Sequence, residues 1–150
     1  MGAGEEQRSI LLLDDELSGM TWMLDYLYSK DFSVDTASNA NDAFELAGKG
    51  KYDAAIIDLN VPLTPPLDTI AEQLDPVYLK FPGLLVAREA RNKGHRGQQI
   101  IIYTVHREAE IKEIADKLGC TYIIKGRPIE IKDELERILL PRSDRRQSSK

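Results

Sequence analysis

The chain has 150 residues, a formal net charge of −5, 42% apolar residues and 30% charged residues. These values are typical of one soluble globular domain, and an acidic balance argues against nucleic acid as a partner. No apolar run approaches the ~20 residues that a membrane-spanning helix needs. The N-terminal residues lack the basic and apolar stretches of a secretory signal, so we expect a cytoplasmic protein without membrane insertion.

Short apolar runs alternate with helical patterns along the chain, which predicts an α/β fold. Strands are expected at Ser9–Leu13, Ser33–Ala37, Tyr52–Asp58, Gln99–Tyr103 and Thr121–Ile124. Helices are expected at about 17–29, Ala40–Ala47, Gly83–Asn92 and Glu108–Leu118, and from Pro128 to a stop at Pro141. Such alternation winds right-handed, which predicts a doubly wound five-stranded parallel sheet in the flavodoxin-like strand order 2-1-3-4-5, with five flanking helices.

The folded domain is expected to span residues 9–140, with no output domain after it. Residues 1–8 are expected to form a flexible N-terminus, and the basic residues 141–150 a disordered polar tail rather than a binding arm. The single cysteine, Cys120, cannot form an internal disulfide and is expected to be a small apolar residue before a buried strand.

Polar side chains follow four of the predicted strands at their carboxyl ends. Asp14 and Asp15 follow the first strand, Asp58 the third, Thr104 the fourth and Lys125 the fifth. In a doubly wound sheet these ends meet at the edge where ligands bind. Crowded carboxylates repel one another, and an all-oxygen ligand set favours a hard cation such as Mg²⁺. A lysine and a hydroxyl directed to the same place suit phosphoryl oxygens.

Each of these residues also has a purely structural interpretation. Two aspartates after a strand often form a turn and a helix cap. Thr104 fits an ordinary strand residue and Lys125 an ordinary surface charge. The combination is more specific than any member, because four separate strand ends supply the groups that one site needs.

Four segments resemble the motifs of the receiver domains of response regulators, the CheY-like domains of two-component signalling. They are Leu12–Glu16, Tyr52–Pro62, Tyr103-Thr104 and Tyr122–Lys125. The resemblance spans about Ser9 to Leu140. It implies a stand-alone receiver that accepts a phosphoryl group on Asp58 from a sensor histidine kinase or a histidine phosphotransfer protein. It also implies signalling to a downstream effector protein rather than enzymatic turnover.

The resemblance assigns roles to the site residues. Mg²⁺ would be held by the carboxylates of Asp14, Asp15 and Asp58 and the backbone carbonyl of Asn60. Thr104 would hydrogen-bond the phosphoryl group, and Lys125 would pair with it.

Three further residues match positions of the family that act around the site. Tyr122 matches the aromatic switch residue, which turns inward when the threonine moves toward phosphate. Asn60 and His106 match positions that tune dephosphorylation. Tyr122 also fits an ordinary strand aromatic, and His106 also fits a solvent-exposed helix start.

The chain departs from the family pattern after Pro62, where residues 63–82 form an insertion of about 17 residues beyond the usual loop. Four prolines exclude one long helix, and the apolar spacing predicts a short amphipathic helix around Asp68–Leu74. Because the insertion starts beside the site, a lid or partner-docking element is one hypothesis, and a tolerated surface insertion is the other. A second departure is Gly126, where the family usually has proline after the lysine.

Three other functions make different demands on the same residues. A phosphorylation-independent interaction module of this fold is the nearest alternative, although it predicts loss of site residues that are present here. A phosphatase with an aspartyl nucleophile would need a second acid two residues on, where Asn60 stands. A flavin-binding protein would need a phosphate-binding loop where Asp14 and Asp15 lie.

Overall fold

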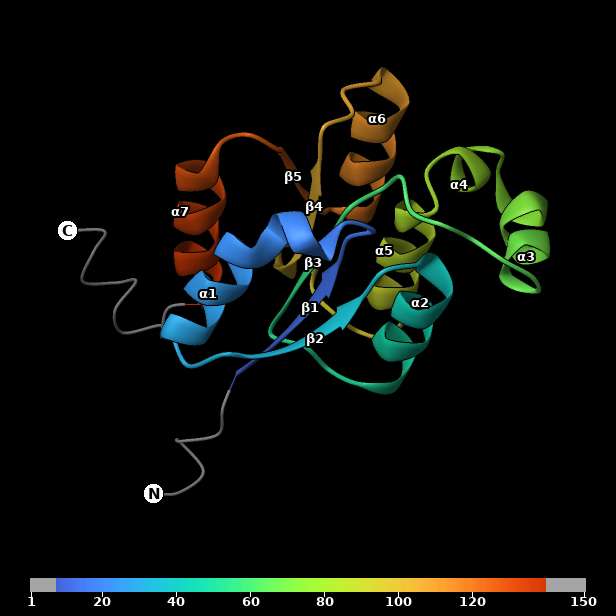
Figure 1. The fold of residues 1–150 in the computed structure, drawn as a ribbon. Coiled ribbons are helices and arrows are strands. Elements are labelled where there is room, and N and C mark those ends of the chain that lie inside the picture. Colours follow the sequence, from blue (N-terminus) through green and yellow to red (C-terminus); the bar gives the residue numbers. More distant parts are fainter. Residues whose placement is uncertain (1–7, 140–150) are drawn as a thin grey trace.

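The computed structural model describes residues 8–139, which form a five-stranded parallel sheet between helices (Figure 1). The strands are β1 (Ser9–Leu13), β2 (Ser33–Ala37), β3 (Ala54–Ile57), β4 (Ile100–Thr104) and β5 (Thr121–Ile124). They lie in the order β2-β1-β3-β4-β5, and every neighbouring pair is parallel. The predicted doubly wound sheet is confirmed.

Seven α-helices and two 3₁₀ turns lie among residues 8–139. They are η2 (Leu17–Met20), α1 (Thr21–Ser29), α2 (Ala40–Lys49), α3 (Leu67–Leu74), α4 (Val77–Lys80), α5 (Gly83–Asn92), η3 (Gly97–Gln99), α6 (Ala109–Leu118) and α7 (Pro128–Leu139). Five are the predicted flanking helices, and α3 is the helix predicted in the insertion; α4 was not predicted. None of these helices is long and apolar enough to cross a membrane. The predicted flexible start, polar tail and stop at Pro141 fall almost wholly outside the described residues.

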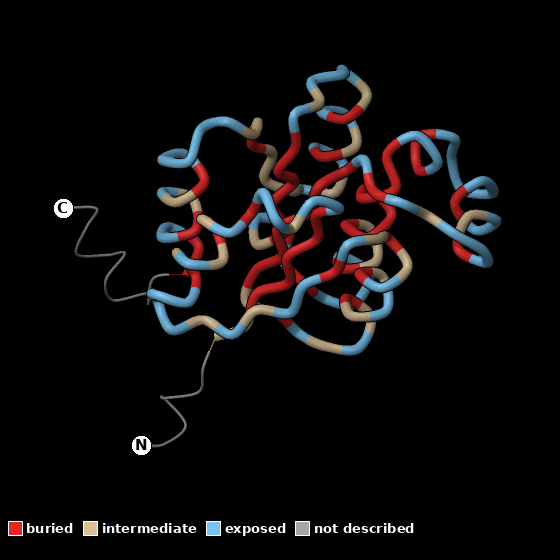
Figure 2. The backbone as a smooth tube through the Cα atoms, in the orientation of Figure 1, coloured by how far each residue is buried: buried red, intermediate tan, exposed pale blue. Residues whose placement is uncertain are grey.

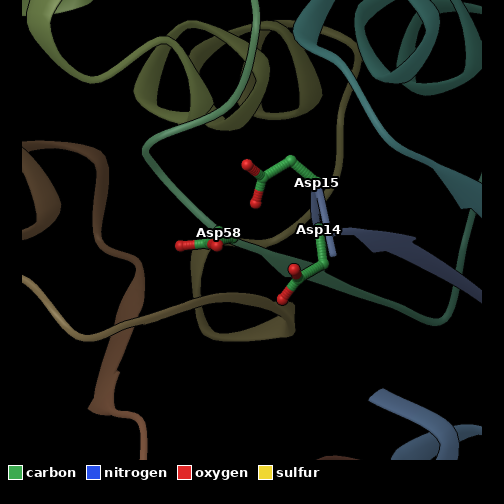
Figure 3. A group of neighbouring side chains, drawn as sticks. All are labelled: Asp14, Asp15 and Asp58. Carbon is green, nitrogen blue, oxygen red and sulfur yellow. The ribbon is translucent and has the colours of Figure 1, made fainter. Parts of the chain in front are cut away.

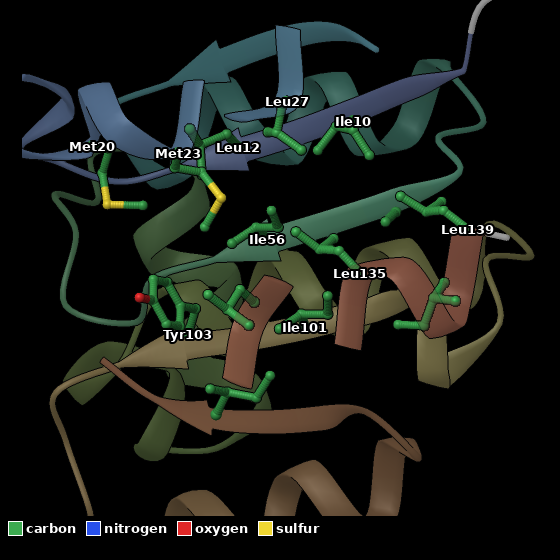
Figure 4. Packing of buried hydrophobic residues seen from close by; sticks show 14 residues of the cluster. Ile10, Leu12, Met20, Met23, Leu27, Ile56, Ile101, Tyr103, Leu135 and Leu139 are labelled. Atoms are coloured by element: carbon green, nitrogen blue, oxygen red, sulfur yellow. The ribbon is translucent and has the colours of Figure 1, made fainter. Parts of the chain in front are cut away.

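Consecutive residues of β1 point to opposite faces of the sheet, and both faces are covered, which explains why Ile10–Leu13 are all apolar. Ile10 and Leu12 pack with residues of α1 and α7, and Figure 4 shows this cluster. Leu11 and Leu13 pack with residues of α2 and α5 on the other face. The sheet therefore lies between two helical layers, and Figure 2 shows its inner strands buried.

Two predicted elements differ most from those observed. The helix expected at 17–29 begins with the 3₁₀ turn Leu17–Met20 and becomes α-helical only at Thr21. The strand expected at Tyr52–Asp58 is shorter at its start, because the Tyr52 N–H donates to His95 Nε2 at 2.9 Å instead of to a neighbouring strand. The other predicted ends among the described residues coincide with the observed ends or differ by one or two residues.

The insertion packs against the domain rather than extending from it. In Figure 1 its helix α4 lies between α5 and the outer helix α3, and the inner residues of α3 and α4 share an apolar cluster with α5, β4 and α6. The buried residues from the insertion are Leu67, Ala71, Val77, Tyr78, Phe81 and Pro82. The insertion is thus part of the core, while its use as a lid or docking element stays a prediction.

Local hydrogen bonds explain how the insertion starts and why α4 forms. Asn41 of α2 holds Thr64 at both backbone groups, accepting from its N–H at 2.9 Å and donating to its carbonyl at 3.0 Å. The Asp75 carboxylate accepts from the Val77 N–H at 2.9 Å, across Pro76, and so satisfies a donor at the start of α4.

Candidate functional site

Three carboxylates converge at the carboxyl ends of β1 and β3 (Figure 3). The two strands are paired, with Leu13 beside Ile57, so Asp14 and Asp58 leave them side by side. One oxygen of each carboxylate, Asp15 included, lies within 4.8 Å of the others. Asp14 is 2% exposed and Asp58 9%, whereas Asp15 is exposed. The predicted gathering of these residues is confirmed.

Each buried carboxylate uses one oxygen for the local backbone and the other for Lys125. Asp14 Oδ1 accepts from the Glu16 N–H at 2.9 Å, and Asp58 Oδ1 accepts from the Leu59 N–H at 2.8 Å. Lys125 Nζ donates to Asp14 Oδ2 at 2.6 Å and to Asp58 Oδ2 at 3.1 Å. The lysine therefore bridges the two buried acids.

Burial and charge act in opposite directions on these groups. Burial raises the pKa of Asp58 above its usual range; Lys125 lowers it, while Asp14 adds to the rise. Burial by itself lowers the pKa of Lys125, but its hydrogen bond to Asp14 and the charge of Asp58 outweigh that effect, so this pKa is raised. Lys125 accordingly remains a cation beside two carboxylates.

The missing proline after Lys125 does not displace the lysine. Its backbone N–H donates to the Thr104 carbonyl at 2.8 Å, which continues the pairing of β5 with β4. Gly126 then takes a positive φ of 102°, a conformation that favours glycine. Lys125 Nζ also lies 5.9 Å from the centroid of the Tyr103 ring, within cation–π range. The predicted position of Lys125 beside the carboxylates is confirmed, and its role toward a phosphoryl group stays a prediction.

Thr104, Tyr122 and His106 form one connected group at the end of β4. Thr104 is fully buried, and its Oγ1 accepts from the His106 N–H at 3.3 Å. The Tyr122 hydroxyl donates to the His106 carbonyl. His106 lies partly buried in the loop before α6, so its interpretation as a solvent-exposed helix start is wrong. The switch roles of Thr104 and Tyr122 remain predictions.

Asn60 lies in the loop after β3, two residues beyond Asp58, with its side chain exposed. The backbone carbonyl of Asn60 therefore remains a predicted metal ligand.

Gly83, at the start of α5, lies directly against the Asp58 backbone. A Cβ atom at Gly83 would be 2.1 Å from the Asp58 carbonyl oxygen and 2.8 Å from Leu59 Cα. The Gly83 N–H donates to the Leu59 carbonyl at 3.0 Å. Because only a residue without a side chain permits this approach, Gly83 determines how α5 meets the site.

The donor set fits a hard divalent cation. All three side chains offer carboxylate oxygens, and two of the carboxylates are buried. A cation would stabilise the ionised form of Asp58, whose pKa is raised mainly by burial and further by the charge of Asp14. Sequence reasoning found these three carboxylates, but it missed Phe81, whose ring meets His106, because no local pattern marks a contact between distant segments.

No family model and no curated protein matches this sequence. Solved structures do match its fold. Chemotaxis protein CheY4 of Vibrio cholerae has a TM-score of 0.66 and 21% identity over 89% of this chain and 100% of its own. Response regulator TrrA of Thermotoga maritima, in complex with Mg²⁺ and BeF, has a TM-score of 0.66 and 24% identity over the same shares.

A third similar structure is the receiver domain of a Pseudomonas aeruginosa sensor histidine kinase, with a magnesium ion in its active-site cleft. It has a TM-score of 0.63 and 23% identity, over 88% of this chain and 97% of its own. Together with the strand order, these matches show that the chain has the fold of the CheY-like receiver domains of response regulators.

Proposed function

We propose that this chain acts as a response-regulator receiver, which accepts a phosphoryl group on Asp58 in a Mg²⁺-dependent reaction. The observation that carries the proposal is Asp58 itself. In a receiver fold, this buried carboxylate lies between two other aspartates and a lysine bridge. The phosphoryl donor would be a sensor histidine kinase or a histidine phosphotransfer protein.

The transfer would make one bond and break one. Asp58 Oδ2 attacks phosphorus in line, and the phosphorus–nitrogen bond of the donor's phosphohistidine breaks. Burial raises the pKa of Asp58 and makes its ionised form a stronger nucleophile than an exposed carboxylate. Lys125 already contacts Asp58 Oδ2. As negative charge develops on the phosphoryl oxygens, its ammonium group would also pair with them and stabilise that charge.

Asp14, Asp15, Asp58 and the backbone carbonyl of Asn60 would hold the metal. Bound Mg²⁺ would neutralise the carboxylates and stabilise charge on the phosphoryl group. Because Asp15 is exposed, it would complete the ligand set from the solvent side.

Signalling would run through the group at the end of β4. Thr104 Oγ1 now accepts from the His106 N–H, and its hydroxyl hydrogen is available to a phosphoryl oxygen. A shift of Thr104 would move His106 and with it Tyr122, whose hydroxyl is bound to the His106 carbonyl. An effector protein would read this change on α6, β5 and α7. In this proposal the chain is a signalling domain and not a turnover enzyme.

Mass spectrometry with Mg²⁺ and acetyl phosphate tests the proposal. The wild type should gain one phosphoryl group, and Asp58→Ala or EDTA should abolish the gain. Glu113→Gln, an exposed change on α6, serves as control. A phosphoryl group on another residue, or no gain together with no Mg²⁺ binding, would favour a phosphorylation-independent interaction module instead.

A further inference from the structure

The insertion ends in a contact with the residue that holds Thr104 and Tyr122. Phe81, which follows α4, is 2% exposed, and its ring centroid lies 5.3 Å from that of His106 at an interplanar angle of 59°. The His106 N–H binds the Thr104 hydroxyl at 3.3 Å, and the His106 carbonyl binds the Tyr122 hydroxyl. One loop residue therefore joins the insertion to both proposed switch residues.

A second contact joins the insertion to α6, the helix that follows the loop 105–108. Lys80 Nζ lies 2.7 Å from Glu110 Oε1 in the first turn of α6. This pair is exposed, so it contributes little by itself. The buried ring of Phe81 is the stronger element, since an aromatic pair adds directional contact to its apolar burial. Two consecutive insertion residues thus contact the loop and the helix that follows it.

Phe81 is also tied to the phosphoacceptor through the backbone. Gly83 lies two residues after Phe81 and packs against the Asp58 carbonyl, with its N–H bound to the Leu59 carbonyl at 3.0 Å. The position of Phe81 is therefore set by the backbone beside Asp58. Close-packed interiors transmit such constraints, because neighbouring groups have no free space in which to relax.

We propose that Phe81 is a positioning residue for the phosphoryl-binding hydroxyl of Thr104. Its ring holds His106, and through the backbone of His106 it keeps Thr104 and Tyr122 in one arrangement before any phosphoryl group is present. The inference rests on the proposed function. A ligand that needs this arrangement binds less tightly when the arrangement is less populated, so loosening the loop weakens phosphoryl binding without touching a ligand of the metal.

The test compares two aromatic residues of the insertion. Phe81→Leu removes the ring that meets His106, Phe81→Tyr keeps it, and Tyr78→Leu removes a buried ring of α4 in the same apolar cluster. Three quantities are measured: hydrogen exchange of the His106 amide, affinity for beryllofluoride as a phosphoryl mimic in Mg²⁺, and affinity for Mg²⁺ alone.

Phe81→Leu should speed exchange of the His106 amide and weaken beryllofluoride binding about fivefold or more, the range of a coupling between sites. Its Mg²⁺ affinity should stay that of the wild type. Phe81→Tyr should restore both quantities, and Tyr78→Leu should leave the His106 amide unaffected beyond any global change. Should Phe81→Leu not fold, His106→Ala removes the other ring and keeps both backbone groups.

A folded Phe81→Leu that matches Tyr78→Leu in amide exchange and beryllofluoride affinity would overturn the inference. If the wild type binds no beryllofluoride, the proposed function fails and the positioning role fails with it. The two failures are distinguishable, because the first leaves wild-type beryllofluoride binding intact.

Discussion

Lys125 Nζ lies 2.6 Å from Asp14 Oδ2 and 3.1 Å from Asp58 Oδ2, so the closer of these two carboxylates is a proposed metal ligand rather than the proposed phosphoacceptor. The lysine and a bound cation would therefore neutralise the same two carboxylates. This relationship leads to opposite expectations for Lys125 variants with and without Mg²⁺.

Lys125→Met should destabilise the metal-free protein by about 2–3 kcal/mol, because two buried carboxylates lose their shared cation. The same variant should bind Mg²⁺ about fivefold more tightly, since removal of a nearby positive charge is worth ~1 kcal/mol at a solvated site. Denaturation in EDTA and in Mg²⁺ measures both effects. Equal Mg²⁺ affinity in variant and wild type would show that the lysine does not compete with the cation.

Asp58→Asn should stabilise the metal-free protein at neutral pH. Burial raises the pKa of Asp58 in the folded state, so stability is lost as pH rises through that pKa and Asp58 ionises. The neutral amide avoids this loss, which predicts a gain on the order of 1 kcal/mol. The gain should shrink as the pH falls to where the wild-type carboxyl is protonated. Urea titrations at several pH values in EDTA measure it, and a gain that persists in acid would contradict the argument.

In the presence of Mg²⁺ the wild type should instead be more stable than Asp58→Asn. The wild type gains the binding free energy of the metal, whereas Asp58→Asn loses a charged ligand and gains less.

Asp14→Asn and Asp15→Asn should separate metal binding from stability. Each removes a negative charge from the proposed metal site, which should weaken Mg²⁺ about tenfold or more. Asp15 is exposed, so its substitution should change the free energy of unfolding by only about 0.5 kcal/mol. Asp14 is buried and bound to Lys125 and the Glu16 N–H, so Asp14→Asn should also cost stability. Calorimetric titration and denaturation together check this, and equal unfolding costs for the two variants would refute it.

Gly83→Ala should destabilise the protein by about 3 kcal/mol, because its methyl group has no space and overpacking forces a backbone shift. The new Cβ would meet the Asp58 carbonyl oxygen at 2.1 Å, so Mg²⁺ binding should weaken too. Gly19→Ala is the matched control, since a Cβ there meets nothing within 4 Å. The control should change stability by no more than about 0.5 kcal/mol. A Gly83→Ala protein as stable as the control would disprove the close approach.

Several site residues were predictable because of where they stand in the sequence. Asp14 and Asp58 each follow an apolar run, and parallel strands bring such ends to one edge of a sheet. Lys125 was predictable for the same reason, and backbone pairing of β5 with β4 holds it there although Gly126 replaces the usual proline. Periodicity also predicted α3, but α4 has only four residues and too little pattern to detect.

The amino-acid sequence by itself determined the strand order, the gathering of acidic residues and the lysine that faces them, because alternating strands and helices allow few ways to wind. Only the tertiary structure decided that Asp15 is exposed while Asp14 is buried, that Lys125 lies closest to Asp14, and that Phe81 meets His106. These features depend on how segments distant in sequence pack against one another, and local periodicity carries no record of that packing.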